Sequence, residues 1–174
     1  MKKVRLFIAS SLDGYIARKN GDIDWLFADQ DYGYGDFVAG IDTVVMGRKT
    51  YEQILDFGEY PYQGMMGFVF SQTRSGEKDE NVAFVEGDLK EFINQQRHQT
   101  GKAIWLVGGG EIIYHFLLQG LVDELILSVH PIILGDGIPL ILRDSRLETV
   151  MKLRNMTAYD SGLVQLYYDL SSGA

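Results

Sequence analysis

The stretch that most constrains the fold is Ala103–Tyr114, where an apolar run breaks on three consecutive glycines and then resumes with helical spacing. Residues 103–107 have the composition of a buried strand, and the apolar residues after the glycines recur at the spacing of a helix. A strand that passes through a glycine turn into a helix is a building unit of α/β domains. Gly108-Gly109-Gly110 is therefore either a tight turn or a phosphate site at a helix N-terminus.

Short apolar runs and helical patterns alternate along the rest of the chain. The pattern predicts strands over 4–9, 43–46, 67–70, 82–85, 103–107 and 124–129, with helices ending near 40 and spanning 50–57, 88–100 and 110–119. Asp88 and Glu91 have the spacing of a capping box. The intervening segments 10–22 and 131–139 are rich in turn residues and predict loops.

The C-terminal part of the chain departs from this alternation. Two strand-like segments, 152–155 and 163–169, follow each other without a helical pattern between them. Such a pair favours antiparallel strands at one edge of a mainly parallel sheet. No shift in composition marks a boundary, so we expect one α/β domain over residues 1–174.

Charge and composition exclude several classes of function. The net charge is −8 and the pI is about 4.8, which argues against broad binding to nucleic acid or to an anionic membrane. The chain has no cysteine, and His98, His115 and His130 do not have the spacing of metal ligands. Neither a signal peptide nor a membrane span is evident, so we expect a cytoplasmic protein without a metal site. Any anionic ligand must be held locally.

Three predicted strand ends carry polar or glycine-rich segments: 47–50, 71–74 and 108–110. Ligands of open parallel sheets bind where the carboxyl ends of the strands meet, so we expect the three segments to face one cleft. Arg48 and Lys49 lie in the first turn of a predicted helix, where cations are unfavourable unless an anion is bound there. The spacing of neither the G-x-G-x-x-G fingerprint nor the P-loop is present.

Val44–Tyr51 (VVMGRKTY) and Ile104–Gly110 (IWLVGGG) together resemble the paired cofactor motifs of the dihydrofolate reductase superfamily. Segments 10–17 and 122–137 resemble the branch that includes the reductase domain of bacterial riboflavin biosynthesis. The resemblance covers nearly the whole chain. It implies a three-layer α-β-α fold around a twisted, mostly parallel sheet, NADPH as the hydride donor, and a homodimer.

The resemblance also implies which positions contact the cofactor: Ala9, Ile16, Gly47, Arg48, Lys49, Thr50, Ser71, Gln72, Thr73, Arg74, Val107, Gly108, Gly109, Gly110, Glu111 and Ile112. The first two would flank the nicotinamide, and segment 47–50 would lie along the phosphates. Segment 71–74 would meet the adenosine ribose and its 2′-phosphate, and segment 107–112 would hold the pyrophosphate. Gln72 stands where members of this branch often have arginine, so a preference for NADPH over NADH depends on Arg48 or Arg74.

On the substrate side, the resemblance points to Asp13, Trp25 and Tyr51. Asp13 could act as the catalytic carboxylate that binds the substrate or polarises the group receiving hydride, or it could be only the Asp of an Asp-Gly turn. Trp25 could line the pocket or belong to the core. The acidic residues that follow Trp25 do not match the pattern of dihydrofolate reductases proper, which argues against folate reduction.

The leading hypothesis is an NAD(P)H-dependent reductase that transfers hydride to a small heterocyclic substrate. The substrate class expected from the branch is that of 5-amino-6-(5-phosphoribosylamino)uracil reductase in riboflavin biosynthesis. A dihydrofolate or pterin reductase is the first alternative. A nucleotide-binding protein without catalysis is the second.

Overall fold

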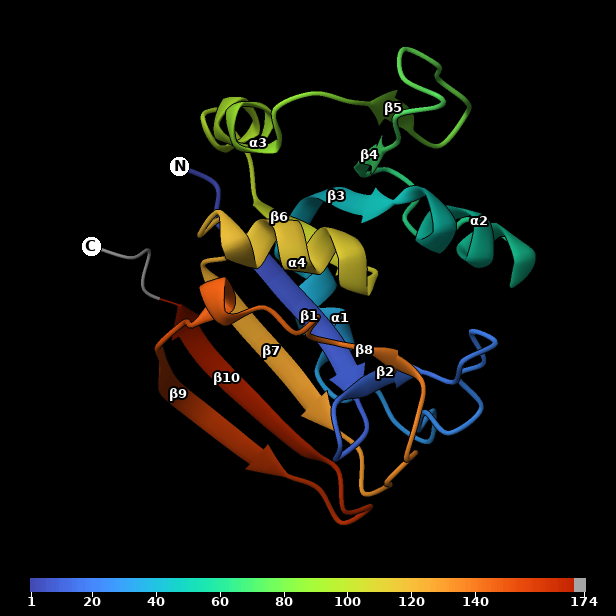
Figure 1. Ribbon diagram of the computed structural model, residues 1–174, viewed down its shortest axis with the longest axis vertical. Helices are drawn as coiled ribbons and strands as arrows, with labels where there is room; N and C mark the ends of the chain where they lie inside the picture. The colour runs from blue at the N-terminus through green and yellow to red at the C-terminus, as the bar shows by residue number, and fades with distance from the viewer. Residues whose placement is uncertain (171–174) are drawn as a thin grey trace.

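The computed structural model describes residues 1–170 and contains an eight-stranded sheet (Figure 1). From one edge to the other, its strands are β5 (Ala83–Val85), β4 (Met66–Phe70), β3 (Ile41–Gly47), β6 (Ala103–Gly108), β1 (Val4–Ser10), β7 (Glu124–Val129), β10 (Val164–Leu170) and β9 (Met151–Ala158). The first six pair in parallel, and β10 pairs antiparallel with both of its neighbours. The predicted mostly parallel sheet with antiparallel edge strands is confirmed.

The helices form a layer on each side of the sheet. Helices α3 (Leu89–Arg97) and α4 (Gly110–Leu118) contribute to one core cluster, while α1 (Tyr34–Ala39) and α2 (Arg48–Asp56) contribute to the other. Successive side chains of a strand point to opposite faces, so Leu6 of β1 lies in the first cluster while Phe7 packs against the second. The three-layer α-β-α fold is confirmed.

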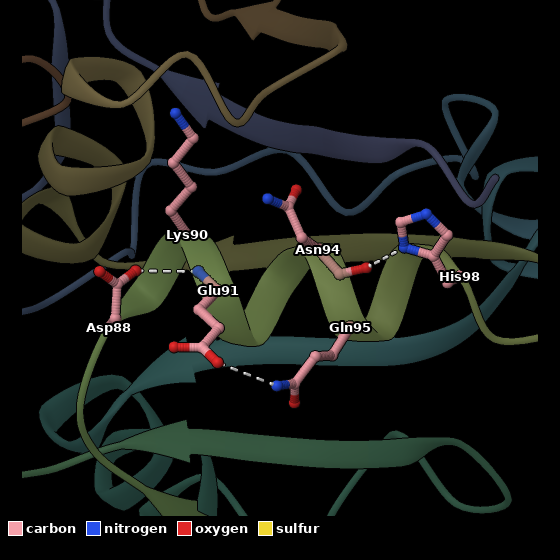
Figure 2. Close-up of a pocket in the computed structure, with 6 residues that line it drawn as sticks. All are labelled: Asp88, Lys90, Glu91, Asn94, Gln95 and His98. Atoms are coloured by element: carbon pink, nitrogen blue, oxygen red, sulfur yellow. Dashed lines mark hydrogen bonds between the residues drawn. The ribbon is translucent and has the colours of Figure 1, made fainter.

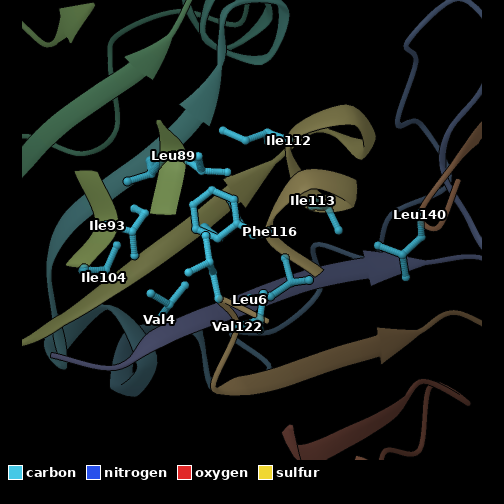
Figure 3. Close-up of a cluster of buried hydrophobic side chains, with 13 residues drawn as sticks. Val4, Leu6, Leu89, Ile93, Ile104, Ile112, Ile113, Phe116, Val122 and Leu140 are labelled. Carbon is cyan, nitrogen blue, oxygen red and sulfur yellow. The ribbon is translucent and has the colours of Figure 1, made fainter. Parts of the chain in front are cut away.

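The first core cluster centres on Phe116, whose side chain is fully buried (Figure 3). Its apolar partners come from α3, α4 and the three central strands β3, β6 and β1. The second cluster is aromatic: Trp105 meets Phe37 and Tyr62 with ring centroids 5.1 Å apart in each case. These two clusters hold the central strands rigidly and so fix the sheet edge where the strands end.

Two segments predicted as loops contain short strands. Strand β2 (Tyr15–Ala17) lies within segment 10–22, and β8 (Ile138–Pro139) lies within the glycine-rich segment that follows β7. They pair antiparallel with each other and form a separate two-stranded ribbon. Strands of two or three residues carry no periodic signal, so only the long-range pairing reveals them. The prediction of uninterrupted loops was wrong here.

Several element boundaries also differ from the predictions. Helix α2 begins at Arg48, two residues earlier than predicted, and β9 is twice as long as the predicted segment 152–155. Helix α3 ends at Arg97, although the pattern predicted a helix through residue 100. A 3-10 helix, η1 (Ser145–Leu147), follows the ribbon. Within residues 1–170, no helix has the length and apolarity needed to cross a bilayer.

At the start of α3, half of the predicted capping box is present. The Asp88 carboxylate accepts a hydrogen bond from the backbone N–H of Glu91 at 2.8 Å (Figure 2). The Glu91 carboxylate accepts from Gln95 at 3.5 Å, one turn further along the helix. Asp88 is thus the N-cap, as predicted, and Glu91 faces along the helix surface.

Candidate active site

The three polar strand ends lie at one edge of the sheet. Strands β4, β3 and β6 are direct neighbours, with Gly47 in register with Phe70 and Met46 in register with Gly108. Segments 47–50, 71–74 and 108–110 therefore leave the sheet side by side, as the alternation of strands and helices predicted. Ala9 reaches the same edge, because β1 runs parallel to β6.

Two helices begin next to each other at this edge. Gly47 is the N-cap of α2 and Gly109 is the N-cap of α4, and neither has a side chain that could accept a hydrogen bond from the first turn. A methyl group added to Gly109 would lie 3.2 Å from the Thr50 hydroxyl, so the two turns are close in space. The first-turn N–H groups of both helices are thus available to an anion, which the two helix dipoles favour. The peptide bond between Gly108 and Gly109 is cis.

The start of α4 also contacts the β2–β8 ribbon. A Cβ atom on Gly110 would lie 2.7 Å from the carbonyl oxygen of Pro139 in β8, which leaves no room for a side chain. The partner strand β2 contains Ile16, which is half-buried against the first core cluster. The ribbon therefore brings Ile16, predicted to flank the nicotinamide, towards the glycine turn.

Both arginines at this edge are engaged in surface ion pairs. Nη1 of Arg48 lies 2.8 Å and 3.1 Å from the two carboxylate oxygens of Glu52, one helical turn away. Nε of Arg74 lies 2.8 Å from Glu77, and its guanidinium stacks 3.8 Å from the ring centroid of Phe84. Lys49 is exposed and forms no ion pair within residues 1–170. The sequence did not predict these acidic partners.

The segment after β4 is folded back on itself. Ser71 is buried, its backbone N–H donates to Val85, and its hydroxyl accepts from the N–H of Arg74 at 3.3 Å. Gln72 and Thr73 are exposed at the bend. The segment thus presents an amide and a hydroxyl to solvent at the position predicted for the adenosine ribose.

Tyr51 has a structural position. Its side chain is only 1% exposed, and its hydroxyl donates to Asp79 at 2.7 Å, which fastens the segment after β4 to α2. A side chain this deeply buried has almost no surface to offer a substrate. The substrate role predicted for Tyr51 is not favoured by this placement.

Asp13 links two loops. Its carboxylate accepts hydrogen bonds from the Ser11 hydroxyl at 2.6 Å and from the backbone N–H groups of Leu134 and Gly135 at 3.1 Å and 2.8 Å. The Ser11 bond, assisted by those from Gly135 and Leu134, holds the pKa of Asp13 below its usual range. The side chain is nevertheless exposed, so contact with a substrate stays a prediction.

Trp25 is buried beside His130, which follows β7 directly. The ring centroids of Trp25 and His130 are 5.3 Å apart, and the His130 backbone N–H donates to Ser10 at the end of β1. Nε2 of His130 accepts the backbone N–H of Phe27 at 3.1 Å, and Nδ1 donates to the carbonyl of Ser128. Burial lowers the pKa of His130, which fits this neutral tautomer.

The contacts of His130 hold the segment around Trp25 against the sheet edge. The indole N–H of Trp25 is buried and has no hydrogen-bond partner within residues 1–170. Trp25 therefore lies at the predicted substrate side, although mainly as a packed residue. The sequence did not predict the hydrogen bond between Phe27 and His130, because these two residues are far apart along the chain.

A surface depression of about 520 Å³ lies elsewhere, along the outer side of α3 (Figure 2). It is lined by Asp88, Lys90, Glu91, Asn94, Gln95 and His98. Their hydrogen bonds run within the helix, including one between His98 and the carbonyl of Asn94. None of the predicted site residues lies there, so the sheet edge remains the candidate site.

Comparison with known proteins identifies the family. The RibD C-terminal domain matches residues 63–165 of this chain, which include β4, β6, α4 and the glycine turn. The chain belongs to the RibD C-terminal domain family. YwjB of Bacillus subtilis is 37% identical over 171 residues, covering 96% of this chain and 97% of that protein.

Two solved structures support the same fold. A putative riboflavin biosynthesis protein from Shewanella superposes with a TM-score of 0.86 at 30% identity, covering 97% of this chain and 99% of the other. Dihydrofolate reductase from Enterococcus faecalis, in complex with NADP(H), superposes with a TM-score of 0.70 at 13% identity over 97% and 96% of the chains. The family indicates a reductase, and the superpositions show the dihydrofolate reductase fold.

Proposed function

We propose that this RibD-type domain is an NAD(P)H-dependent reductase that acts on a phosphoribosylamino-pyrimidine, as 5-amino-6-(5-phosphoribosylamino)uracil reductases do. The observation that carries the proposal is the pair of adjacent helix N-termini, at Gly47 and Gly109, that lack a capping side chain. Membership of the RibD C-terminal domain family supports this substrate class.

The residues at the sheet edge fit a dinucleotide. Gly47 and Gly109 leave the backbone open to a pyrophosphate, and the Thr50 hydroxyl lies beside the glycine turn at Gly109. Exposed groups of segment 71–74 would meet the adenosine ribose, and Ala9 and Ile16 would flank the nicotinamide. The bound nicotinamide supplies the hydride, and the protein supplies orientation and charge.

Asp13 would act as an acceptor and not as an acid. Its lowered pKa keeps the carboxylate ionised at neutral pH, so it can receive hydrogen bonds from a ring amide or a sugar hydroxyl. It has no proton to donate under these conditions. Because Leu134 and Gly135 also bind this carboxylate, Asp13 would place the two loops around the substrate at the same time.

The proposal is tested by following the absorbance of reduced nicotinamide with the pyrimidine or with dihydrofolate as acceptor. We expect turnover with the pyrimidine; turnover with dihydrofolate alone would favour the pterin alternative. Quenching of Trp25 and Trp105 fluorescence reports nucleotide binding separately. Binding without turnover would favour the non-catalytic alternative, and no binding would refute the proposal. Light scattering on the same sample tests the homodimer that the resemblance implies.

Arg48→Ala is expected to weaken the binding of NADPH about fivefold and to leave the binding of NADH nearly unchanged. The reason is that an exposed cation near the 2′-phosphate contributes roughly 1 kcal/mol. Titration calorimetry with both nucleotides measures the two changes. Equal losses for NADPH and NADH would place Arg48 on the pyrophosphate instead. Arg143→Ala, an exposed arginine on the chain after the ribbon, is the charge-matched control.

Asp13→Asn is expected to lower kcat/KM about tenfold. The amide of asparagine cannot accept hydrogen bonds from the Ser11 hydroxyl and two backbone N–H groups as the carboxylate does. The loop that loses these bonds would then misplace the substrate. Steady-state kinetics measure the change. Asp36→Asn, on the exposed side of α1, removes the same charge away from the loops. Equal kcat/KM in both variants would contradict a role for Asp13.

A further inference from the structure

The end of the site that would receive the adenosine ribose has no excess of positive charge. It consists of α2 and the segment 71–82, whose ionisable side chains comprise four cations and five carboxylates, a net charge of −1. These residues are Arg48, Lys49, Arg74, Lys78, Glu52, Asp56, Glu77, Asp79 and Glu80. A site built to select a 2′-phosphate over a hydroxyl requires a surplus of cations, which this end lacks.

The two arginines best placed for a phosphate already have acidic partners. Glu52 binds Arg48 through both carboxylate oxygens, and Glu77 binds Nε of Arg74. The pKa of Arg74 is raised by its bond to Glu77, with Asp79 and Glu52 adding to the effect. Glu52 therefore acts on both arginines. These ion pairs are exposed, so each can open, but a phosphate must compete with a carboxylate for each guanidinium.

A ribose 2′-hydroxyl, unlike a phosphate, does not have to compete with these carboxylates for the guanidinium groups. A 2′-hydroxyl can donate a hydrogen bond to a carboxylate, the interaction by which acidic residues favour NAD in other nucleotide sites. A 2′-phosphate has only acceptor oxygens and is repelled by the same carboxylate. Gln72, at the bend after β4, is neutral and serves either ligand.

Resting on the proposed function, we propose that Glu52 and Glu77 determine cofactor specificity: they neutralise Arg48 and Arg74, so that the reductase binds NADPH and NADH with similar affinity. Both are specificity-determining residues that act through their arginine partners. Replacing both with glutamine, whose amide oxygen still accepts a hydrogen bond, should shift the preference towards NADPH without changing the affinity for NADH.

The test uses adenosine 2′,5′-bisphosphate (2′,5′-ADP) and 5′-AMP, which differ by the 2′-phosphate alone and require no turnover. Titration calorimetry on the wild-type protein should give dissociation constants within about tenfold of each other. In the Glu52→Gln/Glu77→Gln double variant, 2′,5′-ADP should bind about 10- to 30-fold more tightly, since each lost carboxylate relieves roughly fivefold of repulsion. Binding of 5′-AMP should stay unchanged, and the salt dependence of 2′,5′-ADP binding should steepen.

Glu91→Gln is the matched control, because it removes one carboxylate from the surface of α3, on the opposite face of the sheet. It should alter neither dissociation constant. A preference for 2′,5′-ADP above about 100-fold in the wild type, or an unchanged ratio in the double variant, would overturn the inference. If neither the wild type nor the variants bind either adenosine compound, the proposed nucleotide site itself fails. The same titrations are repeated on the Glu52→Gln and Glu77→Gln single variants, whose unaltered melting temperatures would show that they are folded.

Discussion

Gly47→Ala should leave the fold intact and weaken nucleotide binding about 10- to 100-fold, the cost of losing one charge-assisted backbone hydrogen bond of roughly 1.5–3 kcal/mol. The backbone of Gly47 has φ −79° and ψ 159°, which alanine adopts without strain. The nearest atom to an added Cβ is the Gly108 carbonyl oxygen at 3.9 Å, an ordinary contact. The methyl group would instead occupy the space between the two helix N-termini.

Titration calorimetry measures the loss of NADPH affinity in Gly47→Ala, and thermal unfolding of the same sample measures whether its fold is intact. Gly35→Ala, in α1, is the matched control, because its added Cβ would meet the carboxylate of Asp31, which precedes the helix, at an ordinary 3.5 Å. We expect its nucleotide affinity to be that of the wild type. A Gly47→Ala variant with a normal melting temperature and normal affinity would show that the phosphates bind elsewhere.

Phe116→Ala is expected to lower the free energy of unfolding by about 3–5 kcal/mol, the range for a phenylalanine removed from a close-packed core. Phe116 is fully buried in α4 and lies among side chains of α3 and the central strands (Figure 3). Its removal leaves a cavity that the surrounding strands cannot close without distortion. For a chain of this length, the melting temperature should fall by about 10 °C.

Urea denaturation followed by circular dichroism measures the loss. The control is Phe57→Ala, at the C-terminal end of α2, where 64% of the side chain is exposed. Surface substitutions of this kind change stability by about 0.5 kcal/mol or less. Similar losses for Phe116→Ala and Phe57→Ala would contradict the assignment of Phe116 to the core.

The sequence predicted the architecture well because hydrophobic periodicity reports burial directly. Each of the six parallel strands gave an apolar run, and the adjacency of segments 47–50, 71–74 and 108–110 followed from parallel strands ending at one edge. The β2–β8 ribbon was missed because its pairing joins residues about 120 positions apart. The end of α3 was also misplaced, since local signals fix helix ends poorly.

Within the candidate site, residue types were easier to predict than their partners. Arg48 and Arg74 stood out as cations at strand ends, but their pairing with Glu52 and Glu77 depends on side-chain geometry. Asp13 stood out before a glycine, while its bonds to Leu134 and Gly135 cross between loops. Tyr51 shares a motif with Arg48, yet its side chain points into the core.

The sequence by itself determined the order of strands and helices along the chain and the glycine turn before α4. These features depend on local residue types: apolar residues recur where an element is buried, and glycine permits backbone angles that other residues avoid. Only the tertiary structure decided that the turns at Gly47 and Gly109 meet, and that carboxylates neutralise the nearby arginines. The physical reason is that local propensity acts over a few residues, whereas an anion site and its net charge arise from groups that folding brings together across the sheet.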